Sequence, residues 1–128
     1  MSTLADEMAA NALEAQKFTR KHLVTELDLS PESVEELELQ FDLVEYAIKG
    51  GKSPENIELL TLLWGSYLGE VMHRLGGEWV QEESEGTRRI AIRGKNQTLY
   101  PHDQVRQRLT GGAQHSVWTY FQQVRASL

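Results

Sequence analysis

Histidine is the side chain of this sequence best suited to acid–base or metal chemistry near neutral pH. The four histidines are His22, His73, His102 and His115. None lies three or four residues from another, so a metal site would need ligands from distant segments. His102 and its neighbour Asp103 are the candidate pair for acid–base chemistry. Because the histidines are far apart in the sequence, we expect them at the surface or at helix ends. We predict no catalytic residue, no metal and no cofactor.

Two kinds of nucleophile are also disfavoured. The chain has no cysteine, which excludes thiolate catalysis, disulfide bonds and cysteine-bound metals. The segment Gly65-Ser66-Tyr67-Leu68-Gly69 superficially resembles a serine-hydrolase elbow, but that motif places its serine two residues from each glycine. The motif also needs a turn from a strand into a helix, whereas this segment lies inside a predicted helix. Ser66 is therefore not predicted to be a nucleophile.

The same predicted helix carries a polar group of three residues. Glu70 and Arg74 are four residues apart with the acid first, and Tyr67 is on the same side. We expect an ion pair at the rim of the helix. The alternative is a small-molecule site between a sheet and this helix, near Tyr67, Glu70, Arg74, Tyr100 and His102.

Charge is distributed unevenly along the chain. Its 13 Lys and Arg against 19 Asp and Glu give a net charge of −6. Residues 1–86 hold six basic and eighteen acidic side chains, whereas residues 87–128 hold seven basic side chains and a single acidic one. We expect the basic part to pair with the acidic part inside the fold. Nucleic-acid binding would instead need a dense basic patch, for which the candidates are Arg88, Arg89, Arg93 and Lys95.

Helical patterns occupy the N-terminal part of the chain. Residues 3–26 begin with a capping pair and carry a thin stripe of small apolar side chains, so we expect this helix to be the least firmly attached element. Residues 54–75 are apolar over most of the helix circumference, which predicts a buried central helix. Its two glycines, Gly65 and Gly69, favour close packing against another element.

A further helix is predicted between those two. Ser30 and Pro31 are typical of a helix start, and the pattern runs to residue 49. Acidic side chains cover much of its surface. It has one inner apolar face and a weaker outer stripe, which could cover a neighbouring helix or form a partner surface, made of Leu39, Leu43 and Tyr46.

The hydrophobic period then changes to that of strands. Residues 79–83, 87–93 and 97–100 predict a three-stranded antiparallel sheet with Gly-containing turns. Cross-strand charge pairing is expected in its first hairpin, where Glu82 and Glu83 should face Arg88 and Arg89. Two helices close the chain, at about residues 101–109 and 114–126. The first is expected to turn Val105 and Leu109 inward, and the second has one apolar face of Val117, Phe121 and Val124.

Length and composition place these elements in a single soluble α+β domain, residues 1–128. The 128 residues are 40% hydrophobic and 25% charged, as in an ordinary globular protein. No apolar run approaches the roughly 20 residues that span a bilayer. Met1–Leu13 contains two acidic residues and no basic one, unlike a signal peptide. We therefore expect three N-terminal helices, the sheet and two C-terminal helices in a cytoplasmic protein without membrane contact.

Several short motifs, in their order and spacing, resemble a widespread bacterial family of small acidic α+β domains of unknown function. The matching segments are Leu27-Asp28-x-Ser30-x-x-Ser33-Val34, Gly65-x-Tyr67-Leu68-Gly69-Glu70-Val71, Gly76-Gly77-x-Trp79-Val80, Tyr100-Pro101-x-x-x-Val105 and Arg108-Leu109. The resemblance covers roughly residues 20–125. It implies helices followed by a small antiparallel sheet and closing helices, and it implies no activity. Some proteins of this size and charge are immunity or accessory proteins, an analogy only.

Three functions follow as hypotheses. The preferred one is a non-enzymatic domain that works through a protein partner or self-association, because no catalytic group is apparent and the acidic helix has a second apolar stripe. The second is a small-molecule-binding domain or enzyme at the site named above. The third, nucleic-acid binding through the basic hairpin, is disfavoured because the arginine-bearing sheet face offers no aromatic residue for base stacking.

Overall fold

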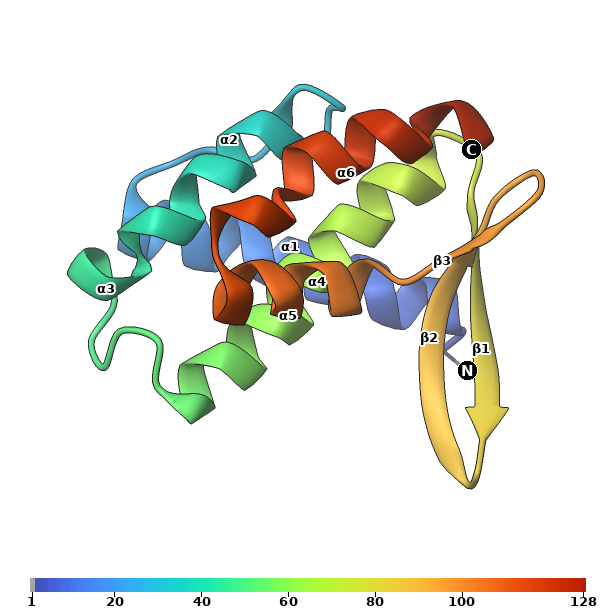
Figure 1. The fold of residues 1–128 in the computed structure, drawn as a ribbon, viewed down its shortest axis with the longest axis horizontal. Coiled ribbons are helices and arrows are strands. Elements are labelled where there is room, and N and C mark those ends of the chain that lie inside the picture. Colours follow the sequence, from blue (N-terminus) through green and yellow to red (C-terminus); the bar gives the residue numbers. More distant parts are fainter. Residues whose placement is uncertain (1) are drawn as a thin grey trace.

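A long central helix, α4 (Pro54–Arg74), organises the molecule. The computed structural model describes residues 2–128, and Figure 1 shows helices packed around α4 with a small sheet at one end. In chain order the other elements are α1 (Leu4–Leu23), α2 (Ser33–Gln40), the 3₁₀ turn η1 (Phe41–Leu43), α3 (Val44–Ala47), β1 (Glu78–Ser84), β2 (Thr87–Arg93), β3 (Thr98–Leu99), α5 (Pro101–Gly111), η2 (Ala113–His115), α6 (Val117–Val124) and η3 (Arg125–Ser127). The predicted α+β class is confirmed.

The buried position of α4 is confirmed. The Ser53 side chain accepts a hydrogen bond from the Asn56 amide at 3.2 Å, and Pro54 occupies the first turn, as the sequence predicts. Trp64 is fully buried and lies edge-on to Phe41 of η1. Most of the remaining α4 positions from residue 60 onward are buried too, so this helix forms the core against which the others pack.

The glycines of α4 allow two close approaches. A Cβ at Gly65 would lie 2.7 Å from the Cα of His102 on α5, and a Cβ at Gly69 would collide with the Trp79 ring of β1. At each glycine, the absence of a side chain lets another element contact the helix backbone. This close packing offsets the lower helix propensity of glycine. The expected role of these glycines is confirmed.

Helix α1 is more firmly attached than expected. It ends at Leu23, and its capping box between Thr3 and Asp6 is present. Small side chains on one face let it lie close along α4, where the Trp64 indole N–H donates a hydrogen bond to the Thr19 hydroxyl at 3.0 Å. The expectation of loose attachment was wrong, because small buried residues permit a close helix contact and one buried hydrogen bond adds to it.

The predicted second helix begins later than expected and is interrupted once. The Asp28 carboxylate accepts hydrogen bonds from the Ser30 amide and hydroxyl, and the Ser30 hydroxyl accepts one from the Ser33 amide, so residues 30–32 form a turn and α2 begins at Ser33. At Leu43 the backbone has φ −95° and ψ −10°, which interrupts the α-helical bonds between α2 and α3. The predicted helix distribution is therefore only roughly matched. The predicted inner face is buried as expected: Val34, Leu37, Phe41, Val44 and Ile48.

The sheet has the predicted order and register. Its strands run β1-β2-β3 with antiparallel neighbours, so β1 is an edge strand. Glu82 faces Arg89 and Glu83 faces Arg88, as predicted. The chain turns between β1 and β2 at Glu85 and Gly86, both with positive φ, which matches a two-residue hairpin turn.

The closing helices complete the core. Val105 and Leu109 of α5 and the face of α6 formed by Val117, Phe121 and Val124 are buried, as predicted. Trp79 is buried like Trp64, whereas Trp118 is only partly buried. Within residues 2–128, no helix has the length and apolarity required to cross a membrane.

Candidate functional site

The structure does not gather the five residues of the predicted small-molecule site. Tyr67 is fully buried and points toward the start of α2, where its hydroxyl accepts a hydrogen bond from the Leu29 amide at 2.8 Å and contacts the Ser33 hydroxyl at 2.6 Å. Burial raises the pKa of Tyr67. The contact with Leu29 holds that residue at a positive φ of 65°, so Tyr67 has a structural role.

The predicted ion pair between Glu70 and Arg74 is wrong. The Trp79 indole N–H donates a hydrogen bond to the Glu70 carboxylate at 3.0 Å, because Trp79 packs on Gly69 beside it. Arg74 is exposed at the end of the helix and borders a hollow that is also lined by Asp28. The indole therefore replaces the guanidinium as the partner of Glu70.

Tyr100 directly precedes α5 and contacts the hairpin of β1 and β2. Its hydroxyl donates a hydrogen bond to Glu82 at 2.9 Å, and the Arg89 guanidinium lies 3.6 Å from the ring centroid. The carboxylate of Glu82 raises the pKa of Tyr100. Arg89 itself forms an ion pair with Asp103 at 2.8 Å.

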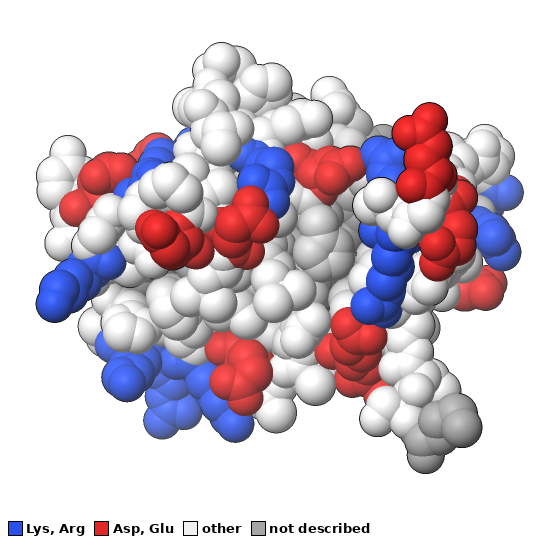
Figure 2. All heavy atoms as spheres, turned by 90° about the horizontal axis from the view of Figure 1, so that it is seen from below, with Lys and Arg blue, Asp and Glu red and all other residues white. Residues whose placement is uncertain are grey.

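The arginines of the hairpin are mostly paired with carboxylates. Arg88 contacts Glu7 of α1 at 2.9 Å and donates to Gln81 at 2.7 Å. The expected cross-strand ion pairs are thus replaced by contacts to other elements, although the register is as predicted. Arg93 and Lys95 are exposed. On the face drawn in Figure 2, most Lys and Arg side chains lie beside Asp or Glu, and several basic side chains gather at its lower left.

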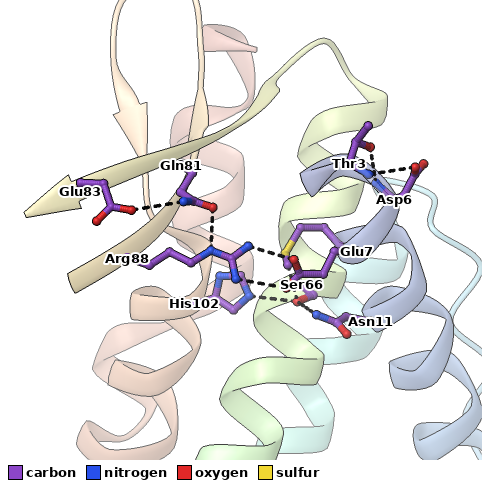
Figure 3. A network of polar contacts seen from close by, with 10 residues as sticks. Thr3, Asp6, Glu7, Asn11, Ser66, Gln81, Glu83, Arg88 and His102 are labelled. Carbon is purple, nitrogen blue, oxygen red and sulfur yellow. Dashed lines mark hydrogen bonds and ion pairs between the residues drawn. The ribbon is translucent and has the colours of Figure 1, made fainter. Parts of the chain in front are cut away.

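His102 is at the centre of a polar cluster that the sequence did not predict. Its Nε2 atom lies 2.9 Å from the buried Ser66 hydroxyl, which also accepts a 3.4 Å hydrogen bond from the side-chain NH₂ group of Asn11 (Figure 3). Burial lowers the pKa of His102 to about 4, although Asp103 opposes this shift. The imidazole is therefore neutral at pH 7.

The expected surface or helix-terminal placement holds for His22, His73 and His102, but the partial burial of His102 and its contact with Ser66 were not expected. His22 and His73 lie in the last turns of α1 and α4. His102 follows Pro101 at the start of α5 and is drawn against α4 because Gly65 has no side chain. The sequence signal for this contact was Gly65, which indicates a close approach to the helix beside Ser66 but does not identify the element that approaches.

This cluster is not arranged for serine nucleophilic catalysis. Ser66 has no exposed surface, so a substrate carbonyl cannot reach its oxygen. The Asp103 carboxylate bonds to Arg89 rather than to the imidazole, so a third group does not orient the histidine as in a catalytic triad. The contact between Ser66 and His102 joins α4 to α5.

A cavity of about 290 Å³ opens beside His102. Met8 of α1, Leu62 of α4 and Ile90 of β2 supply its apolar lining. The two ion pairs of Arg88 with Glu7 and of Arg89 with Asp103 stand at its rim. This cavity lies between sheet and central helix, as the small-molecule alternative expects, but His102 is the only member of the predicted five that lines it.

A second polar cluster, also not predicted, fixes α2 to the closing helices. The Arg108 guanidinium is buried and contacts Glu38 at 2.7 Å and Asp42 at 2.9 Å. The other Glu38 oxygen accepts a hydrogen bond from the Val117 amide at 2.6 Å, at the start of α6. Together with the Arg88 and Arg106 ion pairs, this cluster confirms that the basic C-terminal part pairs with the acidic remainder.

The outer stripe on α2, η1 and α3 is exposed. Leu39, Leu43 and Tyr46 have exposed fractions of 58%, 44% and 88%. Glu35 and Glu36 are exposed one turn before Leu39, on the adjoining helix surface. We call these five residues the docking face.

Residues 2–128 contain no group of three or more His, Asp or Glu side chains placed to hold a metal ion. The comparisons with known proteins leave the family open, and the resemblance to the bacterial domains of unknown function stays a prediction. No protein-family model, no curated protein and no solved structure matches the chain.

Proposed function

We propose that this protein is a non-enzymatic interaction domain that binds a protein partner through the docking face. The observation that carries the proposal is the exposure of three large apolar side chains in a row beside free carboxylates. Exposed apolar groups rimmed by charge are typical of contact surfaces. A role as an accessory or immunity-like protein of a bacterial cytoplasm fits such a domain.

The charge around the docking face indicates the chemistry of the partner. Residues 23–48 contain eight Asp or Glu and no Lys or Arg. Glu38 and Asp42 are paired with Arg108, whereas Glu35 and Glu36 form no ion pair within the part of the chain that the structure describes. The partner is therefore a protein whose contact surface combines Lys or Arg with apolar side chains.

A second copy of this chain is a poorer occupant than a basic protein. Two docking faces in contact would bring Glu35 and Glu36 of both copies together, and like charges repel. Nucleic acid is disfavoured for a related reason. Arg88 and Arg89 already contact carboxylates, so fewer cations are free to displace counterions from a phosphate backbone.

The helices that carry the docking face are packed on the core and joined to α5 by ion pairs. Beneath the docking face the inner side of the same helices is buried, and Arg108 bonds to Glu38 and Asp42. A preformed surface loses little conformational entropy when it binds, which favours recognition by rigid docking.

Site-specific photo-crosslinking in cells of the source organism tests the proposal. The variant carries p-benzoylphenylalanine in place of Tyr46, and the control carries it in place of Leu13, an exposed apolar residue on α1. We expect an adduct from position 46 with a protein whose crosslinked segment is rich in Lys or Arg. Adding Glu35→Lys and Glu36→Lys should reduce that adduct several-fold.

Three results would each overturn the proposal. They are the absence of an adduct beyond that of the Leu13 control, an adduct that the two charge reversals do not weaken, and an adduct between two copies of this chain.

A further inference from the structure

The cavity beside His102 has the composition of a small-molecule site. It joins α1, α4, β2 and α5, whereas the docking face lies on α2, η1 and α3, so the two are separate. Its volume of about 290 Å³ is at the lower end of the range for ligand pockets, roughly 300–1,000 Å³. Met8, Leu62 and Ile90 give it an apolar lining, to which His102 adds a polar group.

The charges at the cavity are balanced. Arg88 contacts Glu7 at 2.9 Å and Arg89 contacts Asp103 at 2.8 Å, so each guanidinium has its own carboxylate. The imidazole of His102 is neutral at pH 7 because desolvation in its half-buried position lowers its pKa to about 4. A charged ligand would compete with a carboxylate or a guanidinium of these half-exposed ion pairs, whereas an uncharged ligand can enter without disturbing either pair.

One ring nitrogen of His102 forms no hydrogen bond within residues 2–128. Nε2 contacts the Ser66 hydroxyl, and the Cδ2 edge of the ring faces Gly65 of α4. Nδ1 lies on the other edge of the ring and has no hydrogen-bond partner among residues 2–128. Figure 3 shows His102 between Ser66 and the Arg88 side chain that bounds the cavity.

We propose that this cavity binds a small, uncharged, mostly apolar molecule that carries one hydrogen-bonding group for Nδ1 of His102. The apolar part contacts Met8, Leu62 and Ile90, and the polar group lies at the imidazole. This inference does not depend on the proposed function, because it uses none of the residues of the docking face.

Binding of three ring compounds to the intact protein tests the inference. Phenol has the required uncharged ring and a hydroxyl that both donates and accepts, benzoate has the same ring with a charge, and toluene lacks the polar group. We expect saturable NMR shifts of the amides around Leu62 and Ile90 with phenol, weaker binding of toluene, and no saturable binding of benzoate. The ring nitrogen signals of His102 should shift with phenol and not with toluene.

A pair of variants locates the site. Leu62→Asp puts a charge on the apolar lining and should weaken phenol binding about tenfold or more, because the ligand loses an apolar contact. Leu59→Asp is the matched control, since Leu59 is similarly exposed on α4 and does not line the cavity. Equal affinity of the two variants, benzoate binding as tight as phenol, or phenol shifts that do not saturate would overturn the inference.

Discussion

Replacing Glu38 with glutamine tests how the closing helices are held. The two Glu38 oxygens accept from different donors, Arg108 Nε at 2.7 Å and the Val117 amide at 2.6 Å. Glutamine has the same shape but a single acceptor oxygen. In either orientation its NH₂ group meets a donor, and Arg108 loses the charge of its main partner.

The expected cost follows from the burial of this pair. The Arg108 side chain is 2% exposed and that of Glu38 is 18% exposed, so water cannot replace the lost contact. Breaking a buried ion pair by removing one partner costs about 3–5 kcal/mol. The free energy of unfolding of a domain of this kind is roughly 5–15 kcal/mol, so the Glu38→Gln variant should remain folded with much reduced stability.

Urea unfolding at pH 7 measures this cost, with Asp42→Asn as the matched control. Asp42 contacts the same guanidinium, but its side chain is 73% exposed, so its loss should cost about 0–1 kcal/mol. A difference between the two variants of less than 1 kcal/mol, at equal denaturant dependence, would refute the reasoning that burial makes Glu38 the dominant partner.

Three further predictions concern the core. Burial lowers the pKa of His102 from 6.5 to about 4. Between pH 6.5 and pH 4, His102 is therefore protonated in the unfolded chain and neutral in the folded chain. Stability should therefore be highest above pH 6.5 and fall by up to about 3 kcal/mol toward pH 4, and a His102→Gln variant should lose part of this dependence in urea titrations. Gly65→Ala should lower the free energy of unfolding by about 1–3 kcal/mol despite the better helix propensity of alanine, and a higher melting temperature would contradict the close approach of α5. Thr19→Val should cost about 1–3 kcal/mol, because the Trp64 indole N–H is left buried without an acceptor, and calorimetry that finds no loss would contradict this.

The sequence was most informative where its signals are local. The helix start at Ser53 and the hairpin turn at Gly86 follow from neighbouring residues, and both are found where predicted. The buried face of α2 follows from helical spacing, which is also local. The exact start of α2 does not, because the Asp28 side chain competes with the helix for the amide of Ser30.

The polar clusters depend on contacts between distant segments and were missed. Ser66 and His102 are 36 residues apart, and Glu38 and Arg108 are 70 apart. Each residue alone has an ordinary explanation in the sequence, such as a helix position or a surface charge. Which acidic side chain contacts which basic one depends on the path of the whole chain. The small-molecule site was therefore predicted at a place where a cavity exists, but only His102 of its five predicted residues lines that cavity.

The edge position of β1 has a consequence for the state of the protein at high concentration. An edge strand offers unpaired backbone groups to which a second strand can add, the first step toward aggregation. Glu82 and Glu83 are adjacent on β1, so a second β1 laid alongside would bring glutamates of both molecules close together. Because Arg88 and Arg89 pair with other carboxylates, Glu82 and Glu83 keep their negative charge at the sheet edge. Repulsion between these glutamates should oppose pairing of β1 with a strand of another molecule.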